Sequence, residues 1–545
     1  MNFSVVDYGV FFGYIIFIVG LGLWVSREKK GHEKDSKDYF LAGKSLPWWA
    51  IGASLIAANI SAEQFIGMSG SGFAIGLAIA SYEWMAAITL IIVGKFFLPI
   101  FIEKKLYTIP EFIEQRFSEN LKTILAVFWI ALFIFVNLTS VLFLGGKAID
   151  TIIGTGDGGI IIWAILGLAF IAAAYSLYGG LSAVAWTDVV QVALLVIGGL
   201  ITSVIALNSV TPEGGVFHGL SHVFNTAGDK FHMILSRDNP EYFNLPGIAV
   251  LIGGMWVANL YYWGFNQYII QRTLAAKSLR EAQRGIAFAA FLKLIIPLIV
   301  VIPGIVAFVM YTQPEGTAAI SGVHEAFSNG EGGINYDKAY PWLISVFIPV
   351  GLKGLVLAAL TAAIVSSLAS MLNSTSTIFT MDIYKPYINK QATEKNLVTT
   401  GRITAFVALL IAILMAPIMG NIPQMFQYIQ EYTGLVSPGI LAVFLMGLFW
   451  KKTTNKAAIV GVLSSIVVAL LLKTAVVDLP WMDQMFYTML ITMVIIAGVS
   501  MTTSEEPDDP KGIDLTASLF KTGPVFNISA YAVMTILVVL YAVFW

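Results

Sequence analysis

Residues 46–72 have the sequence LPWWAIGASLIAANISAEQFIGMSGSG. The stretch is as long as a membrane span, yet its middle carries polar side chains, and three glycines follow them. Polar groups and an irregular backbone are tolerated at mid-bilayer depth only where they line a cavity or are buried in protein. We therefore predict an interrupted helix inside a helical bundle, with a site for a solute and an ion at the interruption. The polar residues are Asn59, Ser61, Glu63 and Gln64.

The composition of the whole chain is that of a membrane protein. Of its 545 residues, 57% are hydrophobic and only 12% are charged, and the mean hydropathy is +0.81. Apolar runs of about 20 residues, each long enough to cross a bilayer, recur along almost the entire sequence. A formal net charge of −2 argues against nucleic acid as a partner, and the absence of cysteine excludes disulfides and thiolate chemistry.

The apolar runs predict an all-α polytopic membrane protein with 14 transmembrane helices in a single transporter domain, residues 1–545. Basic residues are concentrated in every second connection, which places those connections in the cytoplasm and both termini outside a cell (inner) membrane. The acidic connection 503–524 is placed inside as well, because acidic residues contribute little to this rule. The spans are 7–26, 46–70, 74–101, 120–147, 159–178, 182–207, 246–271, 284–311, 340–381, 400–418, 422–449, 455–473, 482–502 and 525–544.

Two of these spans have related interruptions. Ala58-Asn59 lies in the second span, and Ala258-Asn259 lies in the seventh, which crosses the membrane in the opposite direction. Broken helices five spans apart with opposite orientation indicate two inverted five-helix repeats whose binding site lies where the broken helices meet. The repeats would be 46–207 and 246–449, with one helix before them and three, in 455–544, after them.

Charged and amide side chains inside other spans point to the same cavity. Glu83 and Lys293 both lie in apolar surroundings, where an ion is costly unless it faces a polar interior. For Lys293 the alternative is a side chain that extends to the membrane interface. The segment 426–439, FQYIQEYTGLVSPG, adds paired amides, a carboxylate and aromatic rings. Such a set suits a neutral polyhydroxylated ligand, whose hydroxyl groups both donate and accept hydrogen bonds.

The span 340–381 has one polar face of small residues at helical spacing, including Ser366, Ser370 and Thr377. Such a face often allows two membrane helices to approach closely. Alternatively, its hydroxyl groups together with carbonyls freed by a neighbouring helix break could hold a sodium ion, which prefers several oxygen ligands.

Four long motifs resemble the sodium/solute symporter family: DYFLAGKSLPWWAIGASLIAANISAEQFIGMSG, YGGLSAVAWTDVVQ, WVANLYYWGFNQYIIQR and AAIVSSLASMLNS. The resemblance covers nearly the whole chain and is strongest to the sodium/galactose (sodium/glucose-type) branch. It implies a LeuT-type fold of two inverted five-helix repeats, in agreement with the count of spans. One departure concerns the sugar: that branch has a serine at a sugar-contacting position after SYEWM, where this chain has Ala86.

The resemblance also implies roles for individual residues. Sodium would be bound by the carbonyls of Ala57, Ile60 and Ala363 and by the hydroxyls of Ser366 and Ser367, and would leave past Asp188. The sugar would be bound by Asn59, Gln64, Glu83, Asn259, Lys293 and Gln430. The outer gate would consist of Met68, Tyr82 and Phe426, and the inner gate of Tyr262 with Tyr261 and Trp263 beside it.

These observations predict sodium-coupled secondary active symport of a monosaccharide, galactose or glucose, by alternating access, and no enzyme activity. Sodium would be the coupling ion and the lipid bilayer the surrounding medium. The alternatives are symport of another polar solute such as inositol or sialic acid, or a sodium-dependent channel or sensor. A channel would show flux without accumulation, and a sensor would show binding without flux.

Overall fold

The computed structural model describes residues 3–27, 35–154, 158–211, 213–313, 322–328, 332–419, 424–504 and 507–545. Over these ranges the chain is all-helical, and its only bridges between extended residues are isolated pairs. Ten helical segments are long and apolar enough to cross a membrane, or 11 if one bent pair is counted as a span. The prediction of an all-α, multi-pass membrane protein is therefore confirmed.

Several of the ten segments contain a short π-helical or 3-10 stretch, so that one segment joins two to four elements. The ten are α1 (Val5–Val25), η3–α5–η4–α6 (Leu77–Glu103), α8–η5–α9 (Glu119–Ile153), α10 (Ile161–Val210), α15 (Leu279–Thr312), α18–η8 (Leu352–Ile388), α19–η9 (Glu394–Met419), α22 (Asn455–Ala475), α23 (Trp481–Thr503) and α24 (Pro524–Val543). The bent pair is α20 (Met425–Gly434) and α21 (Ser437–Phe449), which meet at 49°.

Two further apolar stretches are interrupted helices, in the two spans where the sequence predicts interruptions. The first consists of α3 (Trp48–Asn59), the π-helical turn η2 (Glu63–Met68) and α4 (Ser69–Ala74). The second consists of α12 (Ala249–Ile252), α13 (Gly254–Phe265) and α14 (Gln267–Leu274). The backbone leaves the helical conformation at Ile60 in the first and at Asn266 in the second, with ψ angles of 103° and 120°. In the second, the breaks lie at Gly253 and Asn266 and not at Ala258-Asn259, which are inside a continuous helix.

The 50-residue helix α10 consists of two helices, which agrees with the predicted division of this region into two spans, 159–178 and 182–207. A kink at Gly180, with φ 62° and ψ −152°, separates its two parts. Gly180 has a positive φ, and a Cβ there would lie 2.3 Å from the Tyr39 carbonyl oxygen, so only glycine fits. The two helices are thus joined directly at a sharp bend, without an intervening loop.

The remaining helices are short and lie in the connections or at the ends of the spans. They are α2 (Ser36–Leu41), η1 (Ala42–Lys44), α7 (Ile109–Arg116), α11 (Gly215–Thr226), η6 (Gly228–Phe231), α16 (Val323–Phe327), η7 (Tyr336–Lys338) and α17 (Ala339–Phe347).

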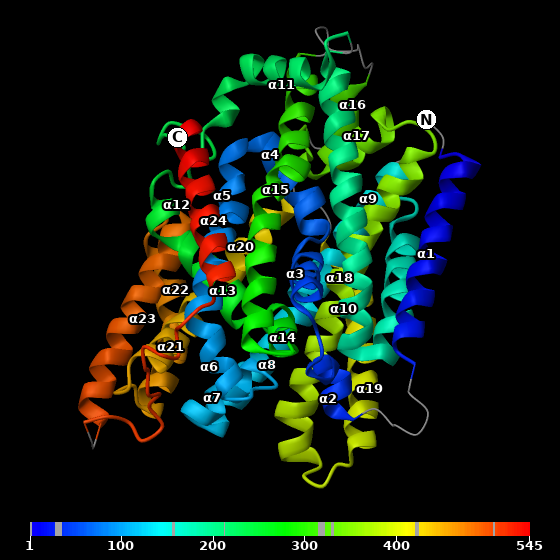
Figure 1. Ribbon diagram of the computed structural model, residues 1–545. Helices are drawn as coiled ribbons and strands as arrows, with labels where there is room; N and C mark the ends of the chain where they lie inside the picture. Colours follow the sequence, from blue (N-terminus) through cyan, green and yellow to red (C-terminus); the bar gives the residue numbers. More distant parts are fainter. Residues whose placement is uncertain are drawn as a thin grey trace.

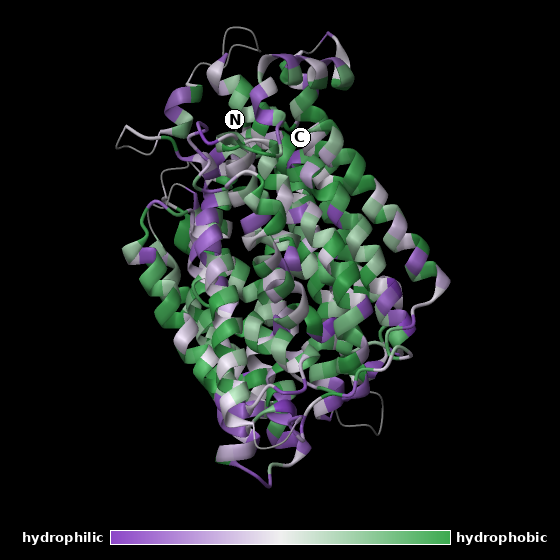
Figure 2. Cartoon of the chain, turned by 90° about the vertical axis from the view of Figure 1, so that its left-hand side faces the viewer, coloured by the Kyte–Doolittle hydropathy of each residue, from purple (hydrophilic) through white to green (hydrophobic). Residues whose placement is uncertain are grey.

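The two chain termini lie at the same end of the bundle (Figure 1). Hydrophilic residues are concentrated at the two ends, and hydrophobic residues dominate the zone between them (Figure 2). The burial of the helices is uneven. In the most apolar window of Leu352–Ile388, 94% of residues are buried inside the protein, against 17% for α1 and for α24. The hydroxyl-rich α18 (Leu352–Ile378) is therefore an inner helix, and α1 and α24 are peripheral.

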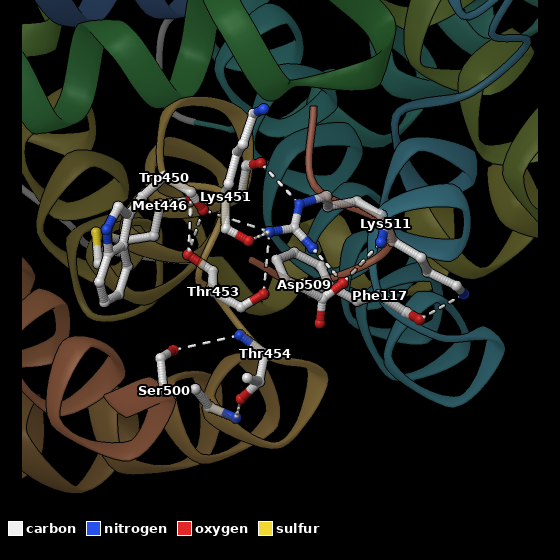
Figure 3. Close-up of polar contacts among 12 residues, drawn as sticks. Phe117, Met446, Trp450, Lys451, Thr453, Thr454, Ser500, Asp509 and Lys511 are labelled. Atoms are coloured by element: carbon white, nitrogen blue, oxygen red, sulfur yellow. Dashed lines mark hydrogen bonds and ion pairs between the residues drawn. The ribbon is translucent and has the colours of Figure 1, made fainter. Parts of the chain in front are cut away.

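At the end opposite the termini, three of the connections predicted to be cytoplasmic pack together (Figure 3). Arg116, at the end of α7, donates to the carbonyl oxygens of Gly447 at 2.9 Å and Thr453 at 3.0 Å, and pairs with Asp509 at 3.3 Å. Lys511 donates to the Phe117 carbonyl at 2.8 Å. The acidic connection 503–524 thus lies on the same side of the bundle as the basic connections 104–122 and 451–456, as the sequence predicts.

Candidate functional site

A cavity lies where the two interrupted helices meet α5 (Ser81–Ile92), α15 and α20. All six residues that the resemblance implies for sugar binding line it: Asn59, Gln64, Glu83, Asn259, Lys293 and Gln430. Five of the six implied gate residues line it as well: Tyr82, Tyr261, Tyr262, Trp263 and Phe426. The sixth, Met68, is fully buried and is not among the lining residues.

A buried ion pair crosses the centre of the cavity. The Lys293 ammonium on α15 donates to Glu83 Oε2 on α5 at 2.5 Å and to the Asn59 amide oxygen on α3. It also lies 5.0 Å from the centre of the Trp263 ring, within range of a cation–π interaction. The ammonium group therefore faces the cavity, and the alternative of a lysine that reaches the membrane interface is wrong.

One side of the cavity is formed by Tyr262, whose hydroxyl group makes two hydrogen bonds. The Tyr262 hydroxyl accepts from the Asn59 amide at 2.9 Å and from the Tyr268 hydroxyl at 2.6 Å. Its ring lies 5.2 Å from that of Trp263. The neighbouring Tyr261 is held separately, because its hydroxyl accepts from the Trp129 indole at 3.1 Å. Tyr262 thus connects the interruption of α3 with the start of α14.

Aromatic rings close the opposite side. Tyr82 and Phe426 pack edge to face with their ring centres 5.1 Å apart. A Cβ on Gly67 would lie 2.8 Å from Phe426 Cβ, so the glycine allows α20 to approach η2 this closely. Since Tyr82 and Phe426 are also buried, the cavity is covered on this side in the present conformation.

The amide side chains of the cavity are partly held by local backbone. Gln64 Oε1 accepts from the Ser61 N–H at 2.9 Å, and Asn259 donates to the Met255 carbonyl at 3.2 Å. Because the Ser61 N–H donates to Gln64, it does not donate to the Ala57 carbonyl, as it would in a continuous helix. The Gln64 side chain, which lines the cavity, therefore takes the N–H that would otherwise bond to the Ala57 carbonyl.

A second polar cluster is formed by the end of α3 and by α18. Ser367 donates to the Ala58 carbonyl at 2.9 Å, and Ser366 donates to Asp188 Oδ1 at 2.5 Å. The implied sodium ligands therefore come from the two helices that the resemblance names, the end of α3 and the middle of α18. All five are buried: Ala57, Ile60, Ala363, Ser366 and Ser367.

Asp188, on α10, belongs to a fully buried network beside this cluster. Its carboxylate accepts from Ser54 and pairs with Arg272 at 3.4 Å. The Arg272 guanidinium also donates to Ser54 Oγ at 2.7 Å and to Ser370 Oγ. Arg272 directly follows the predicted span 246–271 and would by position belong to the next cytoplasmic connection, but it is fully buried. It lies in α14 and joins helices α3, α10 and α18.

Ala86, where the resemblance implies a departure from the related branch, also lines the cavity. The cavity further includes residues to which the sequence assigned no role. Glu63 is buried in η2, within the first helix interruption. Met485, from the C-terminal helix α23, has an apolar side chain that no sequence pattern distinguishes from a lipid-facing one. The full set without an assigned role is Glu63, Ala258, Thr433, Gly434, Ser437 and Met485.

This bundle, with polar interruptions at its centre and two adjoining polar sites, is typical of a coupled membrane transporter. A family model described as the sodium:solute symporter family matches residues 39–465, and the chain belongs to this family. Since the family consists of transporters, the prediction that the chain is not an enzyme is confirmed.

Individual relatives agree with the family. The chain is 64% identical over 542 residues to the sodium/glucose cotransporter of Vibrio parahaemolyticus, with 99% of this chain and 98% of that protein covered. It is 34% identical to the mouse (Mus musculus) sodium/myo-inositol cotransporter 2, with 92% and 78% covered. The substrate-bound outward-open structure of a Na+-coupled sialic acid symporter has the same fold, with a TM-score of 0.78 at 24% identity, covering 92% of this chain and 99% of that one.

Proposed function

We propose that this chain takes up a monosaccharide, glucose or galactose, by coupled symport with sodium. The observation that carries the proposal is the shared helix break. Asn59 and Gln64 line the cavity, while the Ala58 carbonyl, next to the same interruption, accepts a hydrogen bond from Ser367. A ligand bound at either side restrains the same backbone, so each can favour the conformation that binds the other.

In this proposal the sugar binds in the central cavity. Its hydroxyl groups exchange hydrogen bonds with the amides of Gln64, Asn259 and Gln430 and with the Lys293–Glu83 pair. Its apolar face stacks on Tyr262. Sodium binds to the carbonyls of Ala57, Ile60 and Ala363 and the hydroxyls of Ser366 and Ser367, and leaves past Asp188. The relation to a sodium/glucose cotransporter at 64% identity supports the choice of sugar and ion.

The transport cycle follows from the architecture. The segments Trp48–Ala74 and Ala249–Leu274, the two parts of α10 and the bent pair α20–α21 supply the crossings that a 14-span count needs beyond the continuous segments. We propose that residues 46–207 and 246–449 are inverted repeats that move against each other around the fixed site, as in the LeuT-type fold. Both termini would face outside a cell (inner) membrane, opposite the basic connections.

The expected capacity can be estimated for one sodium per sugar. A membrane potential of 100 mV contributes about 2.3 kcal/mol, and a tenfold sodium gradient contributes about 1.4 kcal/mol. Together these would sustain roughly 500-fold accumulation of the sugar. A channel cannot accumulate its solute in this way.

Uptake of labelled glucose and galactose into proteoliposomes tests the proposal. An imposed inward sodium gradient should drive transient accumulation above the external concentration, and an equal potassium gradient should not. Competition by unlabelled galactose, glucose, myo-inositol and sialic acid then ranks the solutes. Equal uptake in sodium and potassium would contradict sodium coupling, and stronger competition by myo-inositol than by either sugar would replace the substrate.

A further inference from the structure

The segment 332–338 lies directly against the outer half of the first interrupted helix. A Cβ on Gly70 of α4 would lie 2.8 Å from the Tyr336 carbonyl, so backbone meets backbone at this point. The segment ends in η7, followed at once by α17, and α4 and α17 are both at the end of the bundle where the termini lie (Figure 1). Within η7, Asp337 is almost completely buried, with 1% of its surface exposed.

The Asp337 carboxylate contacts the first residue of the helix that carries the outer aromatic cover. The Met425 N–H donates to Asp337 Oδ2 at 3.3 Å. The residue that precedes α20, Gln424, makes no side-chain capping bond. A carboxylate at a helix N-terminus satisfies a free N–H and interacts favourably with the helix dipole. The next residue is Phe426, which packs on Tyr82 and Gly67.

The charge on Asp337 depends on its surroundings. Burial raises the pKa of its carboxyl group to about 6, although Lys147 on α9 (Thr139–Ile153) and the Met425 N–H act in the opposite direction. Lys147 is held in place by a bond from its ammonium to Asn335 Oδ1 at 3.1 Å. Of the elements packed against η7, α4 carries no titratable side chain. The titratable and charged residues of the others and of η7 itself are Glu63 on η2, His324 and Glu325 on α16, Tyr340 on α17, and Tyr336 and Lys338.

We propose that Asp337 is a positioning residue for the outer gate. It links the N-terminus of α20 to the external segment 332–338, which packs against α4, and thereby favours the closed gate. The inference rests on the proposed function, because it takes the contact of Tyr82 with Phe426 as the gate. Protonation of Asp337 leaves an accepting oxygen but removes the negative charge that faces the helix N-terminus and Lys147. The closed gate is then less favoured below about pH 6.

The absence of native cysteine allows the gate to be followed with one introduced thiol. Ala86→Cys places it in the cavity, where a membrane-impermeant methanethiosulfonate added outside reacts only while the outer gate is open. Asp337→Ala in this background should speed labelling about fivefold at pH 7.5, the factor that corresponds to about 1 kcal/mol. Asp337→Asn keeps an accepting oxygen without the charge. Its labelling rate should therefore lie between the rate of the Ala86→Cys parent and that of Asp337→Ala.

The pH dependence separates this role from a general loss of structure. Labelling of the parent Ala86→Cys protein should be faster at pH 5.5 than at pH 7.5, and labelling of the Asp337→Asn variant should be equal at both. Rates are divided by those of a cysteine at the exposed loop residue Asp238, which corrects for the reactivity of the thiol. Equal rates for the parent and both variants, or a pH dependence that persists in Asp337→Asn, would overturn the proposal.

If Asp337→Ala fails to fold, the comparison of Asp337→Asn with the parent decides alone. Sodium-driven sugar uptake by the wild-type chain is measured in parallel. Its failure would contradict the proposed function, whereas unchanged labelling in a chain that transports would contradict only the role of Asp337.

Discussion

Two buried ion pairs contact α3, the helix that precedes the first break, at different heights. Lys293 and Glu83 face the central cavity, and the Lys293 ammonium also bonds to Asn59 at the end of α3. Arg272 and Asp188 bond to Ser54, about one and a half turns earlier on α3, and neither lines that cavity. The first pair can exchange partners with a polar ligand, while the second is enclosed by helices.

Because of this difference, we expect the two ion pairs to have different roles. A buried ion pair stabilises a protein only where further hydrogen bonds satisfy its remaining atoms. Arg272 and Asp188 have hydroxyl partners on α3 and α18, the two helices of the implied sodium site. We expect this pair to hold those helices in register, and the pair in the cavity to bind the sugar. Five substitutions, taken from the largest expected effect to the smallest, test the distinction and the two proposed sites.

Arg272→Met should lower the free energy of unfolding by about 3–5 kcal/mol, because it leaves the Asp188 charge buried without a cation. Unfolding of the purified protein in detergent measures the loss. The double variant Arg272→Met, Asp188→Asn removes both charges and should regain most of the stability. A single variant as stable as the wild type would show that the pair does not hold the helices.

Lys293→Met should weaken sugar binding by roughly 10- to 150-fold, the range that corresponds to 1.5–3 kcal/mol for hydrogen bonds to a charged group. Sodium binding should change far less, because the ammonium makes its hydrogen bonds on the cavity side of α3. Equilibrium binding of labelled sugar at saturating sodium provides the measurement. Loss of sodium and sugar binding to the same extent would indicate that this pair, like the other, is structural.

Ser367→Ala and Gln430→Ala form a matched pair, each removing neutral hydrogen-bonding groups. Each should weaken one ligand by roughly 2- to 12-fold, as expected for about 0.5–1.5 kcal/mol. Ser367→Ala should raise the sodium concentration needed for half-maximal uptake, and Gln430→Ala should raise that of the sugar, each leaving the other parameter largely unchanged. Equal shifts of both parameters in both variants would argue against two separate sites.

Ala86→Ser should have the smallest effect, a gain of about two- to fivefold in affinity for the sugar whose hydroxyl group reaches this wall of the cavity. Competition of glucose and galactose for uptake by the wild type and the variant measures it. An unchanged ranking would show that Ala86 does not determine the choice of sugar.

The sequence predicts the outline of the site because polar and charged side chains are costly inside an apolar span and are rarely kept there without a function. Asn59, Glu83 and Lys293 stand out in this way, and the structure brings them together. Arg272 could not be recognised, because a basic residue near the end of a span is usually a residue of the cytoplasmic connection. Its burial depends on how α14 packs against α3 and α18, which hydropathy does not encode.

Other residues lacked a signal of any kind. Met485 reaches the cavity from a helix that resembles a lipid-facing one, and Met68 is fully buried and does not line the cavity. The number of 14 spans and the role of each site residue stay predictions.

The central claim is that one helix break couples sodium to sugar. Its most direct test is reciprocal binding to the purified protein: the dissociation constant of the sugar with and without sodium, and that of sodium with and without the sugar. Linkage requires the two ratios to be equal. The account predicts equal ratios of about fivefold or more, the range of typical couplings. A sugar affinity that is the same in sodium and in potassium would contradict it.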